Sequence, residues 1–101
     1  MSEKIFQGNV IISKKGRDKG RYFVVLYMLD AVFACLTDGD TRKLDHLKKK
    51  KLKHMKTTPY RCDDLIALYE QNQLKDSDIR KALDKFRSLS EKAAVPESPV
   101  N

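Results

Sequence analysis

The sequence GNVIISKKGRDKGRYFVV occupies residues 8–25. Its first part, residues 8–13, is short and rich in β-branched side chains, which predicts a strand. Residues 14–21 hold two glycines, one acid and five cations, a composition that resists burial and predicts an exposed loop. Residues 22–29 form a continuous apolar run whose β-branched and aromatic content favours a second strand. Two strands joined by a basic, glycine-containing loop are therefore expected.

Further short strands are expected downstream of this pair. Residues 32–37 read as a third strand, and Asp38-Gly39 predicts a tight turn because glycine readily supplies the positive φ that such turns need. Residues 41–44 are then expected to pair back as a short strand. Residues 48–51 are expected to form a loop because of their charge, and residues 52–57 a final strand. Five short strands within about 60 residues predict a small closed barrel or sandwich, because closure removes exposed sheet edges.

The chain changes character after residue 60. Asp63 and Asp64 stand at a favourable helix start, because acidic side chains complement the positive end of the helix dipole. Polar residues 72–73 interrupt this first helix, and Asp76 or Ser77 can cap a second. The second helix carries one apolar stripe, made of Ile79, Ala82, Leu83, Phe86 and Leu89. Such a stripe must be buried against the barrel, the first helix or a partner.

The 101 residues have room for one domain and an appendage. The patterns above divide them into a barrel over residues 1–60, a helical C-terminal extension over residues 61–92 and a disordered tail over residues 93–101. The net charge of +7 is unevenly distributed, because residues 1–61 carry +9 and residues 62–101 carry −2. A concentrated positive field attracts polyanions, nucleic acid first and anionic membrane second.

Two basic segments carry the candidate binding residues. In the loop of residues 14–21, glycines allow close approach of the backbone to a phosphate, which the cations neutralise. The loop lacks the spacing of a nucleotide-hydrolysing loop, and an ordinary charged hairpin is its alternative reading. Residues 48–56 contain six lysines, which would repel one another without anions nearby. A nuclear-localisation-like run or a solvated loop is the alternative there. The candidate RNA-binding residues are Lys14, Lys15, Arg17, Lys19, Arg21, Arg42, Lys43, Lys48, Lys49, Lys50, Lys51, Lys53, His54 and Lys56.

Residues 8–25 resemble a KOW motif, in which a strand, a glycine-containing basic loop and a second strand follow one another. The residues that carry the resemblance are Val10, Gly16, Gly20 and the apolar run after Arg21. KOW motifs occur in SH3-like barrels of large-subunit ribosomal proteins and transcription-elongation factors. The continuation to the lysine-rich segment resembles short bacterial KOW proteins that are similar to archaeal and eukaryotic ribosomal proteins. It departs from them at residues 45–47, which stand where a proline is expected.

The resemblance covers residues 5–58 and implies a mostly β fold, an SH3-like β-barrel (KOW domain) followed by two short C-terminal helices. It implies RNA binding, with large-subunit ribosomal RNA as the expected partner and ribosomal proteins or tRNA as further candidates. We expect a monomer off the ribosome. Affinity should fall steeply with salt, and RNA shape rather than base sequence should be recognised. The alternative is a protein-interaction module that uses the barrel groove or the C-terminal amphipathic helix within a transcription or translation complex.

Other kinds of site find little support in the sequence. Cys35, His46, His54 and Cys62 lack the spacing of a metal site, and the two cysteines are expected to be free thiols. No catalytic grouping is legible, so we expect neither an enzyme nor a cofactor. Tyr22 borders the basic loop and is the one aromatic residue considered for base stacking.

The same patterns bear on where the protein works. No run of about 18 apolar residues predicts a transmembrane helix. The N-terminus also lacks the apolar stretch of a secretory signal, so the protein is expected to be cytoplasmic.

Overall fold

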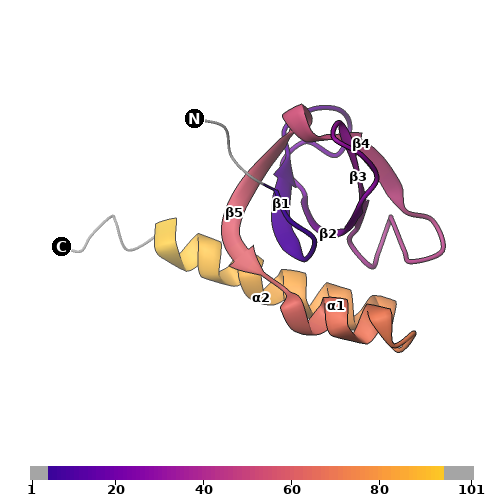
Figure 1. Ribbon diagram of the computed structural model, residues 1–101. Coiled ribbons are helices and arrows are strands. Elements are labelled where there is room, and N and C mark those ends of the chain that lie inside the picture. Colours follow the sequence, from indigo (N-terminus) through magenta and orange to yellow (C-terminus); the bar gives the residue numbers. More distant parts are fainter. Residues whose placement is uncertain (1–4, 95–101) are drawn as a thin grey trace.

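The computed structural model describes residues 5–94, which form one antiparallel sheet followed by two helices (Figure 1). The strands are β1 (Asn9–Ser13), β2 (Tyr22–Met28), β3 (Phe33–Thr37), β4 (Lys48–Lys51) and β5 (Met55–Arg61). A 3-10 turn, η1 (Leu52–His54), separates β4 from β5. The helices are α1 (Asp63–Glu70) and α2 (Asp76–Ala94). The strand order is β4-β3-β2-β1-β5, and both helices lie at one end of the curved sheet.

The apolar run of residues 22–29 is explained by burial of β2 on both faces. Phe23 and Val25 join a cluster with Ile11 inside the curved sheet. Val24 points the other way and joins a second cluster between the sheet and the helices. Because successive side chains of a strand alternate between faces, a strand covered on both sides must be apolar throughout. The three strands expected over residues 8–37 are confirmed to within about two residues.

The segment between β3 and β5 differs from the sequence-based expectation in two ways. Residues 41–44 were expected to be a strand but form a turn and bends. The Asp38 carboxylate accepts hydrogen bonds from the backbone N–H groups of Asp40 (2.9 Å) and Arg42 (2.8 Å). The Thr41 hydroxyl also donates to Asp38. These donors are therefore satisfied within the turn rather than in a strand ladder.

Residues 48–51 were expected to be a loop, and this prediction was wrong. They form β4, in which Lys49 pairs with Cys35 and Lys50 with Ala34 of β3. Charge opposes burial of a lysine side chain but does not prevent its backbone from completing a sheet. The expectation failed because it judged the segment by composition alone.

The final strand begins and ends later than expected. Residues 52–54 form η1, and β5 runs from Met55 to Arg61 through Pro59. Proline is tolerated there because β5 is the last strand on its side of the sheet order. Buried Asn9 of β1 spans a register shift between the two strands, where its side-chain amide donates to the carbonyls of Thr58 (3.1 Å) and Tyr60 (3.0 Å).

The apolar stripe of α2 faces the sheet. Ile79 and Leu83 are buried beside Val10 and Val24, and the Phe86 ring stacks on that of Tyr60 with centroids 4.8 Å apart. Both helices begin where acidic residues predicted them, at Asp63 and Asp76. The predicted tail of residues 93–101 overlaps the end of α2 at residues 93–94, and residues 95–101 lie outside the described residues.

The contact between the 38–42 turn and α2 gives a stability prediction. Gly39 has a φ of +72°, and a Cβ added there would lie 2.5 Å from the backbone oxygen of Asp76. Gly20 has a similar φ of +87°, but a Cβ there would have open space. We expect Gly20→Ala to lower the free energy of unfolding by about 1–2 kcal/mol through backbone strain. Gly39→Ala should lower it further, because α2 must also shift. Urea denaturation of both variants tests this, and equal losses would contradict the clash.

Candidate nucleic-acid interface

The loop of residues 14–21 joins β1 to β2 and is held by its own backbone. Gly20 N–H donates to the Ser13 carbonyl (2.8 Å), and Arg21 N–H donates to the Asp18 carbonyl (2.9 Å). Gly16 and Gly20 have φ angles of +90° and +87°, a region that side chains rarely adopt. The glycines therefore allow a compact turn that presents its cations to solvent. Lys14, Lys15, Arg17 and Lys19 are all exposed.

Asp18, the one acid of this loop, ties it to β4. Its carboxylate accepts a hydrogen bond from the Ser13 hydroxyl (2.8 Å) and forms ion pairs with Lys48 Nζ (3.3 Å) and Lys50 Nζ (3.4 Å). Lys50 Nζ also donates to the Lys15 carbonyl at 2.9 Å. Burial by itself would raise the pKa of Asp18, but the Ser13 hydrogen bond and the two lysine charges outweigh it and hold that pKa below its usual range. Asp18 thus fixes the loop relative to the strand.

The lysines of β4 divide between two faces. Lys48 and Lys50 turn toward Asp18, and Lys50 is buried, so this candidate binding residue acts as an internal tie in the free protein. Lys49, on the opposite face, lies with its ammonium 4.6 Å from the centre of the Phe33 ring, a cation–π contact. Lys51 follows the Lys49 face by alternation and is exposed. The lysine-rich segment is therefore not one continuous clamp.

The remaining candidates of that segment lie on η1 and β5. Lys53 and Lys56 are exposed, and His54 is half-buried. Desolvation and the nearby charges of Lys15 and Lys53 hold the pKa of His54 below its ordinary value. His54 is accordingly neutral at pH 7 in the free protein, where it can offer a hydrogen bond but no charge. Its backbone carbonyl accepts a bond from Lys14 N–H at 2.8 Å, which links η1 to the basic loop.

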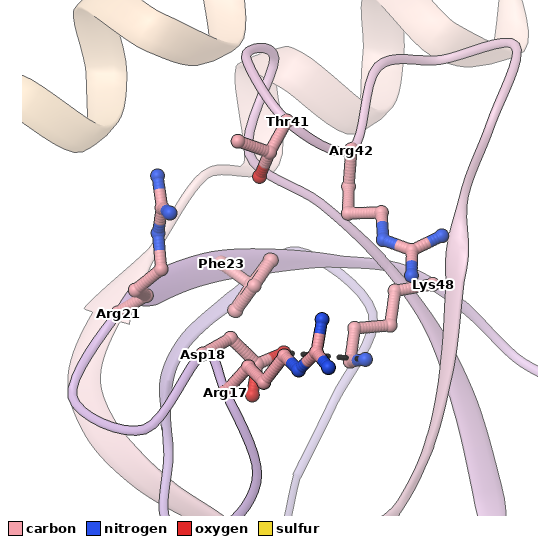
Figure 2. Close-up of a pocket in the computed structure, with 7 residues that line it drawn as sticks. All are labelled: Arg17, Asp18, Arg21, Phe23, Thr41, Arg42 and Lys48. Atoms are coloured by element: carbon pink, nitrogen blue, oxygen red, sulfur yellow. Dashed lines mark ion pairs between the residues drawn. The ribbon is translucent and has the colours of Figure 1, made fainter.

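A cavity of about 290 Å³ opens between the basic loop, the 38–42 turn and β4. Figure 2 shows the side chains that line it, which are Arg17, Asp18, Arg21, Phe23, Thr41, Arg42 and Lys48. The side chains of Arg17, Arg42 and Lys48 converge in this view, and the dashed line joins Lys48 to Asp18. Three segments distant in sequence thus supply one cluster of cations.

The arginines of this cavity are not equivalent. Arg21 extends toward Asp38 and Asp40, with ion-pair distances of 3.8 Å and 4.0 Å. The guanidinium groups of Arg17 and Arg42 form no ion pair or hydrogen bond with any residue that the structure describes. These two groups are therefore available to an anion. Lys43, next to Arg42, is exposed and does not line the cavity.

Aromatic residues offer little to a stacked base near the loop. The Tyr22 ring is half-buried against the helix-side core, with the Arg87 guanidinium 5.7 Å from its centre. Phe23 is buried, and Phe33 carries Lys49. Phe6 is 45% exposed, beneath Arg61. The expectation that Tyr22 could hold a base therefore has a competing contact.

The cysteines and histidines remain apart from this surface. Burial and the nearby carboxylates of Asp64 and Asp63 raise the pKa of the Cys62 thiol to about 11, so it is protonated at neutral pH. Both cysteines are free and buried. Within residues 5–94, no group of three or more His, Cys, Asp or Glu side chains is placed to hold a metal ion.

Comparison with known proteins adds no relative. The chain matches no protein family and no curated protein sequence. The KOW resemblance therefore rests on the residues of the motif themselves. Neither α1 nor α2, the helices of the described part of the chain, is long and apolar enough to cross a membrane.

The Asp18 ties give a pH-dependent prediction. Asp18→Asn leaves Lys48 and Lys50 without their carboxylate, so we expect it to lower the free energy of unfolding by about 1–3 kcal/mol near neutral pH. The folded-state pKa of Asp18 lies below its unfolded value of about 3.9. The advantage of the wild type is thus fully present above about pH 4 and is lost as pH falls through the folded-state pKa.

Urea titrations of wild type and Asp18→Asn at neutral pH and at about pH 3 measure this difference. Asp45→Asn, which removes an exposed acid, is the matched control and should have little effect. A destabilisation by Asp18→Asn that does not shrink in acid would contradict the assigned ion pairs.

Proposed function

We propose that this protein binds structured RNA through the surface formed by the basic loop, the 38–42 turn and β4, and that large-subunit ribosomal RNA is its target. The observation that carries the proposal is the convergence of Arg17, Arg42 and Lys48 on one cavity, with two guanidinium groups lacking a protein partner. Clustered cations without anions repel one another, and a phosphate backbone relieves that repulsion.

We further propose that the sheet is the SH3-like barrel that the KOW resemblance implies. The two outer strands, β4 and β5, are joined by the three residues of η1. A connection this short keeps the two ends of the strand order close, which favours a sheet curled onto itself. The placement of the basic loop between β1 and β2 agrees with the order of the KOW motif.

Recognition by this surface would be electrostatic and largely independent of base sequence. Lysines and arginines at loop tips suit phosphate oxygens, whereas base reading in RNA needs unstacked bases held on aromatic faces. About four phosphates neutralised would make the logarithm of the affinity fall with the logarithm of salt concentration at a slope of roughly −3. Ribosome association in the cytoplasm, with the free protein a monomer, belongs to this proposal.

A protein-interaction role is the second candidate. A cavity of about 260 Å³ on another part of the surface is lined mainly by apolar side chains, among them Leu26, Tyr27, Leu47 and Leu74. Exposed Met28, Leu29 and Val32 lie at the β2–β3 hairpin. The α2 stripe is a weaker basis for such a role, because Ile79 and Leu83 are buried against the sheet.

Charge removal from the loop tests the RNA proposal. We expect Lys14→Gln/Lys15→Gln/Lys19→Gln to weaken binding to rRNA extracted from large subunits by about tenfold or more, and to reduce the salt slope by roughly 1 per lysine. The matched control Lys75→Gln/Lys81→Gln/Lys85→Gln removes the same charge from exposed positions of the helical region. Filter binding across a salt series measures both. Equal losses for the two triple variants would leave only a general charge effect and refute the site.

A further inference from the structure

The cavity between the basic loop and the 38–42 turn has the charge of an anion site. Four cations line it, against the single carboxylate of Asp18. Asp18 is already paired with Lys48, and Arg21 with Asp38 and Asp40. The charges of Arg17 and Arg42 are therefore left without compensation by the described residues, which matches the one or two negative charges of a phosphate group.

The donors of this cavity are held in place before any ligand arrives. Arg42 follows a turn closed by the Asp38 carboxylate, and its carbonyl accepts the Thr37 hydroxyl at 2.7 Å. Arg17 precedes Asp18, which is fixed to β4. Lys48 belongs to β4 itself. Because the backbone positions are set by other contacts, binding need order only the side-chain ends.

The lining favours the phosphate over a base or sugar. The one aromatic residue, Phe23, is 1% exposed and offers no face for stacking. The Thr41 hydroxyl already donates to Asp38, and the Asp18 carboxylate is occupied by Ser13 and two lysines. What remains is guanidinium N–H groups, whose planar fork fits phosphate oxygens.

We propose that this cavity seats one phosphate group, held by the guanidinium groups of Arg17 and Arg42 with Lys48 as the third donor. The site deepens the proposed RNA-binding function, on which it rests only for the source of the phosphate. That source is a backbone phosphodiester of RNA or a small phosphate, and the chemistry of the seat is the same for both. The exposed loop lysines then act around the seat rather than within it.

Titration of the full chain with inorganic phosphate tests the seat. Backbone and arginine Nε–H signals in ¹H–¹⁵N spectra should shift saturably for the loop, the 38–42 turn and β4. Chloride at equal ionic strength should not reproduce these shifts. Arg17→Gln/Arg42→Gln should weaken phosphate binding by about tenfold or more, because charge-assisted hydrogen bonds are lost. The matched control Arg61→Gln/Arg87→Gln removes two arginines outside the cavity and should bind phosphate like the wild type.

Three results would overturn the seat: no saturable shift, a shift that chloride reproduces, or equal affinity in Arg17→Gln/Arg42→Gln. RNA binding measured on the same variants separates the two proposals. A parallel loss of RNA affinity supports a backbone phosphodiester as the occupant. Phosphate binding lost with RNA affinity unchanged supports the seat with a small phosphate as its ligand. RNA binding that persists when phosphate does not bind refutes the seat and leaves the RNA-binding proposal standing.

Discussion

The side chains of β1 and β2 are buried on both faces of the sheet, and the other elements are arranged to keep them so. Ile11 and Phe23 require a cover on the inside of the curved sheet, which Leu36 and Met55 help to supply. Val10 and Val24 require a cover on the other face, which comes from the two helices. The loop between the two strands is too charged to enter either layer, so it remains at their end, where β4 meets it.

Local patterns predicted the elements whose structure is decided locally. The β-branched runs gave three strands, and the acidic starts gave both helices. The patterns were insufficient where distant residues decide the structure. A row of four lysines has no composition that predicts a strand, and β4 exists because the free edge of β3 accepts it. The turn after Thr37 was predicted, but the number of donors that Asp38 satisfies was not, so a strand was expected at residues 41–44.

The candidate site divides in the same way. Its glycines and cations are legible in residues 14–21, because composition alone marks an exposed basic loop. The role of Asp18 is not legible, since its partners Lys48 and Lys50 are some thirty residues away and become neighbours only through the sheet. A lone acid among five cations was the one signal, and turn chemistry explained it equally well. For the same reason, the sequence could not distinguish buried Lys50 from exposed Lys49.

The position of β4 at the end of the strand order bears on how copies of this chain behave toward each other. Among the described residues, β4 pairs with β3 alone, and an unpaired strand edge is a template onto which another chain can add. A second copy aligned there would set two rows of ammonium groups against each other, which is unfavourable for directly opposed like charges. The lysines of β4 thus oppose edge-to-edge aggregation whenever no polyanion is present to neutralise them.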